Sequence, residues 1–199
     1  MGRYSTKDKI RVSGLWQVNE LYKVPLSKTN YKELIFLIKE YNNYAFIDGE
    51  NLYKSIRKQG WKLDYYKFRK YLSDKYNITK ALIFIGYVNW NKALYNYLRK
   101  ASFELVFKQT ITKPNGEPKG NVDAELVLRV MLETENFDKA IIVTCDGDYS
   151  CLVRYLTTKK KLLNLMIPDR RRYSALLRQF RKYIVYMNEL KVKLEYKKR

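Results

Sequence analysis

Two aspartates flank a single glycine in the segment "TCDGDYS", where Asp146 and Asp148 directly follow an apolar run. Carboxylates this close repel each other unless something positive lies between them. Asp48 likewise closes an apolar run in "FIDGENL", with Asn51 three residues on, and Asp123 lies in "KGNVDAEL". Oxygen ligands of this kind suit Mg²⁺ or Mn²⁺, which would activate a water and neutralise charge on a phosphodiester. The pattern therefore favours a metal site for hydrolysis.

Helix capping is the alternative interpretation for several of these residues. Asp148, Asp123 and Asn51 stand near predicted helix starts, where short polar side chains accept hydrogen bonds from free amides. Asp48 and Asp146 fit this interpretation less well, because a carboxylate that ends a buried strand is costly to desolvate without a partner. We therefore favour the metal site and keep capping as the alternative for the first three residues.

The 199 residues include no histidine. This excludes serine–histidine and cysteine–histidine catalysis, HExxH zinc sites and ribonuclease chemistry with a histidine acid. Hydrolysis would then depend on carboxylates with oxygen-binding metals, or on lysine and tyrosine. The two cysteines, Cys145 and Cys151, form no CxxC pattern, so we expect both to be small core residues.

The chain has 40 Lys and Arg against 20 Asp and Glu, a formal net charge of +20. Such an excess favours a polyanionic partner, with nucleic acid the first candidate and an anionic membrane the second. The sequence has no apolar run of about 18 residues that could span a bilayer, and its polar opening does not resemble a signal peptide. We expect a cytoplasmic protein without a membrane partner. The oligomeric state stays open, a homodimer included.

Short apolar runs alternate with amphipathic stretches, which indicates an α/β fold with a parallel sheet covered on both faces. The expected strands lie at 44–47, 81–87, 140–145 and 162–167, with a mixed fifth at 103–111. The expected helices lie at 64–76, 121–133 and 173–184. Because ligands of parallel sheets bind beyond the carboxyl ends of the strands, the acidic motifs could converge there.

Three segments together resemble the NYN domain of the PIN-like nuclease superfamily: "FIDGENL", "KGNVDAELVLRVM" and "IIVTCDGDYSCLVRYL", in this order. The resemblance implies a Rossmann-like three-layer α/β sandwich with a mostly parallel sheet of about five strands. It also implies a metal-dependent ribonuclease site, with four catalytic aspartates and one asparagine as metal ligands. These residues are Asp48, Asn51, Asp123, Asp146 and Asp148.

Two positions depart from the pattern of this family. Cys145 stands where the family usually has serine or threonine, which would remove a hydroxyl hydrogen bond that orients Asp146. Asn121 varies the usual apolar position after "KG". Neither change removes a metal ligand, so the implied ribonuclease site stays complete.

The resemblance divides the chain into three parts. An NYN/PIN-like nuclease domain is expected at 44–187, followed by a basic C-terminal tail at 188–199. Ahead of the domain, residues 1–43 form an N-terminal extension with one amphipathic helix, for which Asn30 and Glu33 make a capping box.

Basic and aromatic residues near the expected site predict how RNA is held. Arg170, Arg171 and Arg172 follow the last predicted strand at the edge that carries the carboxylates, and guanidinium groups pair phosphate oxygens bidentately. Lys119 lies shortly before the helix that carries one of the acidic motifs. Trp90 follows the second strand, where an exposed ring could stack on an unpaired base. We expect all five residues to bind RNA.

The leading interpretation is a metal-dependent ribonuclease that uses Mg²⁺ or Mn²⁺ to cut single-stranded or looped RNA. The first alternative is a catalytically weak or inactive RNA-binding or regulatory module with the same fold. A phosphatase of the haloacid dehalogenase type is the second, because "VTCDGDYS" is an apolar strand followed by DxD. That class needs lysine and acidic motifs downstream, yet after Asp148 the only acidic residues are Asp169, Glu189 and Glu195.

Overall fold

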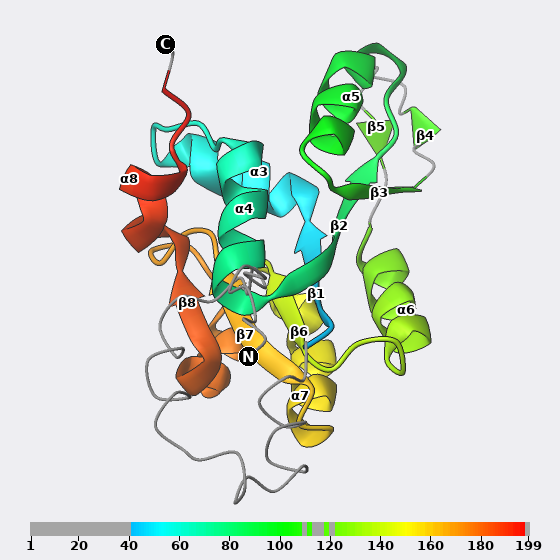
Figure 1. The fold of residues 1–199 in the computed structure, drawn as a ribbon, viewed down its shortest axis with the longest axis vertical. Coiled ribbons are helices and arrows are strands. Elements are labelled where there is room, and N and C mark those ends of the chain that lie inside the picture. The colour runs from blue at the N-terminus through cyan, green and yellow to red at the C-terminus, as the bar shows by residue number, and fades with distance from the viewer. Residues whose placement is uncertain (1–40, 109–110, 113–117, 120–121, 198–199) are drawn as a thin grey trace, which may run out of the picture. The chain divides into compact units, whose positions relative to one another are not determined.

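A parallel sheet of six strands forms the centre of the structure, a computed structural model (Figure 1). The structure describes residues 41–108, 111–112, 118–119 and 122–197. The helix expected in the N-terminal extension lies outside the described residues, as does Asn121.

The strands run in the order β3-β2-β1-β6-β7-β8, and every neighbouring pair is parallel. Their bounds are β1 Asn43–Asp48, β2 Ile78–Gly86, β3 Glu104–Lys108, β6 Ala140–Val143, β7 Leu162–Ile167 and β8 Ile184–Tyr186. A separate antiparallel hairpin consists of β4 (Ile111–Thr112) and β5 (Pro118–Lys119). The predicted fold class is confirmed, and the sheet gains one strand, β8, that the sequence did not predict.

Helices cover both faces of this sheet (Figure 1). The α-helices are α3 Gly49–Lys58, α4 Tyr65–Tyr76, α5 Lys92–Lys100, α6 Asp123–Glu133, α7 Ser150–Thr158 and α8 Lys191–Leu194. Within the described residues the 3₁₀ helices are η2 Asn89–Asn91, η3 Gly147–Tyr149, η4 Ala175–Tyr183 and η5 Met187–Leu190. The helix predicted to begin at Asp64 does so, because this side chain accepts a hydrogen bond from the backbone N–H of Lys67.

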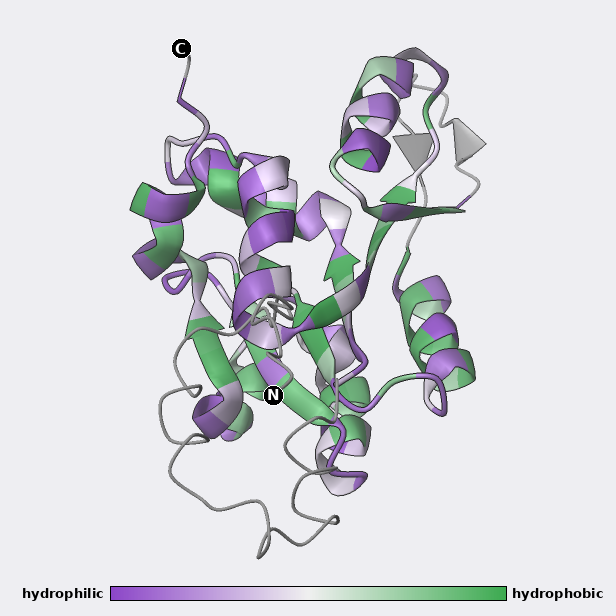
Figure 2. Cartoon of the chain, viewed as in Figure 1, coloured by the Kyte–Doolittle hydropathy of each residue, from purple (hydrophilic) through white to green (hydrophobic). Residues whose placement is uncertain are grey.

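The core forms two layers, one on each face of the sheet. Ala45 and Ile47 of β1 pack in the layer with α3, α4 and α8, whereas Phe46 packs in the layer with α6, α7 and η4. Successive side chains of a strand point to opposite faces, so a central strand needs apolar residues at every position. Figure 2 shows the result: the central strands are hydrophobic along their length, while the helices around them alternate in hydropathy.

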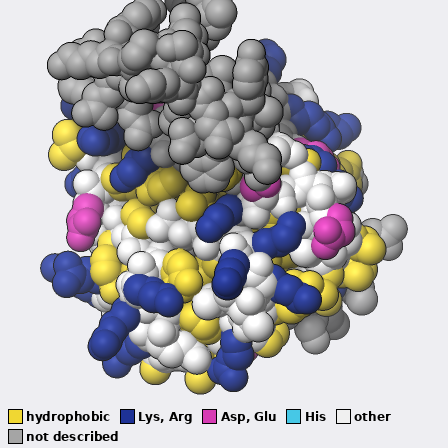
Figure 3. Space-filling view, turned by 60° about the horizontal axis from the view of Figure 1, so that its bottom comes forward, with side chains coloured by type: hydrophobic (Ala, Val, Ile, Leu, Met, Phe, Trp, Pro, Cys, Tyr) yellow, Lys and Arg dark blue, Asp and Glu magenta, His cyan; other side chains and the backbone are white. Residues whose placement is uncertain are grey.

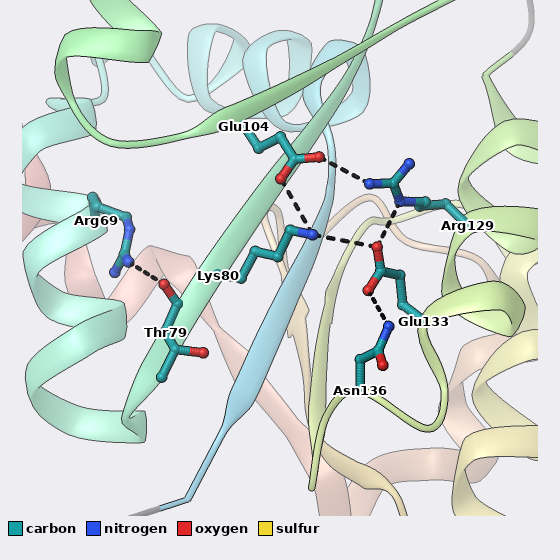
Figure 4. Close-up of polar contacts among 7 residues, drawn as sticks. All are labelled: Arg69, Thr79, Lys80, Glu104, Arg129, Glu133 and Asn136. Atoms are coloured by element: carbon teal, nitrogen blue, oxygen red, sulfur yellow. Dashed lines mark hydrogen bonds and ion pairs between the residues drawn. The ribbon is translucent and has the colours of Figure 1, made fainter.

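A network of charged side chains holds α6 against the sheet (Figure 4). Lys80 of β2 lies 3.3 Å from Glu104 of β3 and 3.2 Å from Glu133 of α6. Arg129 of α6 lies 3.0 Å from each of the same two glutamates. Isolated surface pairs contribute little, but joined pairs fix the relative position of the elements that carry them. The network therefore helps to position the beginning of α6, where one of the expected site residues lies.

The segment 173–184 differs from the α-helix that its apolar spacing predicts. It forms the 3₁₀ helix η4, with non-helical backbone angles at Phe180, and its last residue starts β8. Leu177 and Phe180 are both buried. Two apolar residues three positions apart fit a helix with three residues per turn as well as one with 3.6, so the α-helix prediction is wrong for a physical reason.

The end of the chain also differs from the charged tail that its lysines suggest. Leu190 and Leu194 are buried in the same layer as α3 and α4. The backbone N–H of Tyr196 donates to the carbonyl of Lys62 (2.8 Å). Two leucines four positions apart make a short amphipathic turn, which the surrounding charge obscures. The first part of this segment is therefore part of the core.

The packing of α8 predicts a contrast between two of its residues. Leu194 is 1% exposed and Val192 is 82% exposed. We expect Leu194→Ala to lower the free energy of unfolding by about 2–4 kcal/mol, because it leaves a cavity in the core. Val192→Ala should change it by less than about 0.5 kcal/mol. Urea unfolding followed by circular dichroism measures both, and equal effects would contradict the packing of α8 described above.

Candidate metal centre

The acidic motifs after β1 and β6 lie where the strand order reverses. From β1 the chain continues to β2 and β3 on one side, whereas β6 and β7 lie on the other side. Ile47 pairs with Val143, so Asp48 and Thr144 come at the same level in the two neighbouring strands. Ligands of parallel α/β sheets bind at such a reversal, beyond the carboxyl ends of the strands. The topology therefore brings two distant acidic motifs to one place.

Asp123, Asp146 and Asp148 form a carboxylate cluster. One carboxylate oxygen from each residue lies within 4.8 Å of the others. Asp123 is the first residue of α6, while Asp146 directly precedes η3 and Asp148 lies in it. Three oxygen donors at this separation suit a divalent cation that keeps part of its water shell. The donor set thus fits a hard metal ion such as Mg²⁺ or Mn²⁺.

The helix caps of the site are not those that the sequence suggested. The N-cap of α3 is Asp48, whose Oδ1 accepts from the N–H of Asn51 (3.0 Å). The N-cap of η3 is Asp146, whose Oδ1 accepts from the N–H of Asp148 (3.0 Å). At the start of α6, Asp123 is not the cap residue. The cap hydrogen bonds occupy one carboxylate oxygen of Asp48 and one of Asp146. The second oxygen of each aspartate can still bind a metal ion.

Two hydroxyl groups orient the cluster, and the sequence did not identify either one. Tyr149 OH donates to Asp123 Oδ1 (2.5 Å) and thereby links η3 to α6. The side chain is fully buried. Burial, followed by the charge of Asp48, raises the pKa of Tyr149, so this phenol stays protonated and remains a donor. Thr144 Oγ1 accepts from the N–H of Asp146 (3.0 Å) and fixes the loop that carries this residue.

Asp48 lies outside the group of three but close enough to feel its charge. The residue is only 5% exposed. Burial is the largest cause that raises the pKa of Asp48 from 3.8 to about 6. The hydrogen bond from Asn51 N–H lowers this pKa, while the charges of Asp123 and Asp146 raise it further. An additional positive charge at the site would therefore favour the ionised form of Asp48.

The glycines after Asp48 and Asp146 allow close packing at the site. A Cβ on Gly147 would lie 2.9 Å from the Cβ of Ser174, at the start of η4. A Cβ on Gly49 would lie 2.8 Å from Ile83 Cγ2 of β2. Neither separation is tolerated between carbon atoms, so any larger residue would push the packed elements apart. This requirement accounts for the glycine between the two aspartates of "CDGDY".

A cleft of about 400 Å³ opens beside the carboxylates. It lies between α3, the loop after β6 and the segment that leads from β7 into η4. Its lining includes Asp146 and Asp148 together with three basic residues, Lys54, Lys58 and Arg172. Cations next to carboxylates can hold a phosphate that the carboxylates alone would repel. The two lysines were missed in the sequence, although their spacing of four residues places them on one face of α3.

Asn51 and Cys145 have structural contacts that differ from their expected roles. Asn51 Oδ1, expected as a metal ligand, accepts from the N–H of Cys145 (2.8 Å) and joins α3 to the end of β6. The thiol of Cys145 lies 3.4 Å from the N–H of Asp169. The loop of Asp146 has its hydroxyl contact from Thr144, so the cysteine does not remove it. Cys151, expected in the core, is exposed.

The structure separates the five residues that were expected to bind RNA. Arg172 lines the cleft. The guanidinium of Arg170 lies over the ring of Tyr186 at 5.0 Å, and Arg171 donates its N–H to Asp169 Oδ1. Trp90 is 77% exposed in η2, and Lys119 ends β5. Among the four of these residues whose side chains the structure describes, Arg172 is the one that lines the cleft.

The parallel α/β sandwich with a carboxylate cluster at its strand reversal is consistent with the PIN-like class of nuclease folds. A family model, the NYN domain, matches residues 44–188, well over half of the chain. The chain belongs to the NYN domain family. Nucleases of this class generally use divalent metals, which agrees with the oxygen donors found here.

Two individual proteins are similar to this chain. The low amplitude and bright protein LabA of Synechococcus elongatus is 21% identical over 144 residues, which cover 62% of this chain and 72% of LabA. A crystal structure of a protein of unknown function from Vibrio parahaemolyticus has a TM-score of 0.65 and 21% identity. It covers 79% of this chain and 98% of its own. This second likeness shows the fold alone.

In the ranges that the structure describes, no helix is both long enough and apolar enough to cross a membrane. The homodimer left open by the sequence finds no support in these ranges.

The burial of Asp48 predicts a pH dependence of stability in the absence of metal. Because the folded protein holds this proton more tightly than the unfolded chain, the free energy of unfolding should fall as the pH rises from about 4 through about 6. A shift from 3.8 to about 6 corresponds to up to about 3 kcal/mol, at about 1.4 kcal/mol per pKa unit.

Asp48→Asn should remove this contribution, since asparagine has no proton to lose and still caps a helix. Urea unfolding at about pH 4.5 and about pH 7 in EDTA measures it, with the exposed Asp74→Asn as the matched control. Parallel pH profiles for the parent and Asp48→Asn would show that burial does not perturb this carboxyl.

Proposed function

We propose that the protein is a metal-dependent ribonuclease that hydrolyses phosphodiester bonds of single-stranded or looped RNA. The observation that supports this most is the convergence of Asp123, Asp146 and Asp148 within 4.8 Å of one another, beside a cleft whose lining includes three basic residues. Membership of the NYN family and the net charge of +20 support a polyanionic substrate. Family membership also removes the haloacid dehalogenase alternative.

Asp123, Asp146 and Asp148 would hold Mg²⁺ or Mn²⁺. When bound, such an ion neutralises charge on the phosphate and lowers the pKa of a coordinated water. Tyr149 keeps Asp123 in place through its hydrogen bond, and the N–H of Asp148 does the same for Asp146. Asn51 acts as a positioning residue, because its oxygen fixes the end of β6 against α3.

Asp48 is the fourth acid of the proposed site. Its carboxyl is buried beside the cluster, and the positive charge of a bound ion would favour its ionised form, which can accept a proton. Lys54, Lys58 and Arg172 pair with phosphate oxygens of the RNA in the cleft. Four further residues belong to the proposal as outer RNA contacts: Lys119, Arg170, Arg171 and Trp90.

Cleavage of a fluorescent single-stranded RNA in millimolar Mn²⁺ tests this proposal. We expect the parent protein to cleave the RNA, EDTA to stop it, and Asp146→Asn to lose at least about a hundredfold in rate, as removal of a key charged group commonly does. RNA binding by Asp146→Asn should persist or strengthen, because a negative charge near the phosphates is gone.

Asp74→Asn serves as the matched control, since it removes an exposed carboxylate that pairs with Lys70 of the same helix, α4. Its rate should equal that of the parent. Undiminished cleavage in EDTA or by Asp146→Asn would overturn the metal site. RNA binding without any cleavage by the parent would favour the alternative, a catalytically inactive RNA-binding module.

A further inference from the structure

We propose that single-stranded RNA leaves the cleft along a basic strip formed by the outer sides of η4 and α7. The strip consists of Arg154 of α7 with Arg178, Arg181 and Lys182 of η4. This inference rests on the proposed function, because it describes the path of the same RNA beyond the cut site. It assigns an RNA-binding role to four residues that were not among those expected to bind RNA and that lie outside the carboxylate site.

The strip begins where the cleft ends. Arg172 lines the cleft, and two residues later the N–H of Ser174 donates to the carbonyl of Cys145 (3.0 Å). Ser174 then starts η4, because its Oγ accepts from the N–H of Leu176. The first turn of η4 is thus attached to the loop that carries Asp146. Single-stranded RNA that is held by Arg172 can therefore continue onto η4 without passing over another helix or strand of the protein.

The burial pattern of η4 directs its cations outward. Leu177 and Phe180 are buried in the core, whereas Arg178, Arg181 and Lys182 are exposed. Arg178 and Arg181 are three residues apart, which is one turn of a 3₁₀ helix, and the backbone bends between them at Phe180. The exposed cations of η4 therefore continue the basic surface beyond the cleft.

Neutral partners position three of the four cations without cancelling their charge. Arg154 Nη2 donates to Gln179 Oε1 (3.2 Å), which links α7 to η4. The guanidinium of Arg178 lies 5.9 Å from the ring centre of Tyr173, and Lys182 Nζ lies 4.9 Å from that of Tyr183.

Taking only the described residues, none of the four cations of the strip takes part in an ion pair. Their charge remains available to phosphates, and the adjacent rings could stack on bases. The strip therefore combines the two interactions by which proteins hold single strands.

The flank formed by α6 has the opposite charge. Residues 150–183, which include α7 and η4, contain ten Lys and Arg and one acid, whereas residues 122–139 around α6 contain two Lys and Arg and five acids. One of those two cations, Arg129, is already paired with Glu104 and Glu133 (Figure 4). A polyanion that leaves the cleft is repelled along α6 and attracted along η4.

Figure 3 views the molecule from the lower end of Figure 1, where α7 and the turns before β8 lie. Lys and Arg side chains far outnumber Asp and Glu on the visible part of this face, and hydrophobic side chains lie between them. This distribution agrees with a surface for a flexible polyanion with exposed bases.

Fluorescence anisotropy against salt concentration tests the strip in the Asp146→Asn background, with single-stranded RNAs of about 4 and about 12 nucleotides. Arg178→Gln with Arg181→Gln should weaken binding of the longer RNA and flatten its slope of log affinity against log salt by about 1.4, at about 0.7 per lost contact. The shorter RNA should bind unchanged, because it fits within the cleft. With Asp146 restored, Mn²⁺-dependent cleavage of the shorter RNA should match that of the parent.

Lys191→Gln with Lys193→Gln is the matched control, since it removes the same charge from exposed positions of α8, which packs in the other layer of the core. In the lysine variant, the slope of log affinity against log salt should change by less than half as much as in the arginine variant. Equal slopes for the two double variants would show that net charge alone matters, and an unchanged slope in the arginine variant would place the RNA elsewhere. Either result overturns the strip.

Further outcomes decide whether this face binds RNA or a membrane. They also separate a failure of the strip proposal from a failure of the proposed ribonuclease function. Loss of binding to phosphatidylserine vesicles by the arginine variant, with RNA affinity unchanged, would make this face a membrane surface and overturn the proposal. A parent that cleaves no RNA, together with an arginine variant that loses RNA affinity as expected, would sink the proposed ribonuclease function and leave the strip standing. If the parent cleaves RNA and the arginine variant keeps the RNA affinity of the parent, the ribonuclease function stands and the strip proposal is overturned.

Discussion

Repulsion between carboxylates at the reversal of strand order is the constraint on which the rest of the structure depends. A parallel sheet offers its ligand site at this place, and the chain puts Asp48 and Asp146 there, with Asp123 brought in by α6. Each added negative charge makes the next one harder to ionise: burial is the largest cause that raises the pKa of Asp48, and the charges of Asp123 and Asp146 raise it further. Such a site is stable only with groups that favour the charged forms, and a divalent cation is the most effective of these.

The surrounding residues hold the carboxylates together against this repulsion. Backbone N–H groups donate to the carboxylates of Asp48 and Asp146, and the buried phenol of Tyr149 donates to that of Asp123. Gly49 and Gly147 let the neighbouring elements approach more closely than any side chain would allow. At the far end of α6, the paired charges around Lys80 fix the helix relative to the sheet. The same charges pair Arg129 of the α6 flank, where acids outnumber cations, so the basic excess lies on the other side of the cleft.

Much of this could be predicted from the sequence, because the central strands need apolar residues on both faces. The runs around Phe46, Ile142 and Leu165 indicated three of the central strands, and the polar residues after them indicated the site. What could not be predicted depends on distant contacts. Nothing local distinguishes Tyr149 from a core tyrosine, because its partner lies 26 residues away. In the same way, Leu194 is surrounded by charge and finds its apolar partners only in the folded protein.

The exchange of capping roles has the same physical origin. Short-range rules assign caps to polar residues near helix starts, which favoured Asp148 and Asp123. In the structure Asp48 is the last residue of β1 and directly precedes α3, while Asp146 directly precedes η3, so these two residues become the caps. The first residue of a helix can shift by one or two positions with the geometry of the preceding turn. A sequence pattern is too coarse to predict which of these positions is the cap.

The location of a bound ion tests the central claim most directly. A crystal grown in millimolar Mn²⁺ and measured near the manganese absorption edge would show it as an anomalous peak. We predict one peak among the carboxylates of Asp123, Asp146 and Asp148, lost in a crystal of Asp146→Asn under the same conditions. A crystal of the parent protein with no peak at this cluster, or with an equal peak in both crystals, would contradict the metal site.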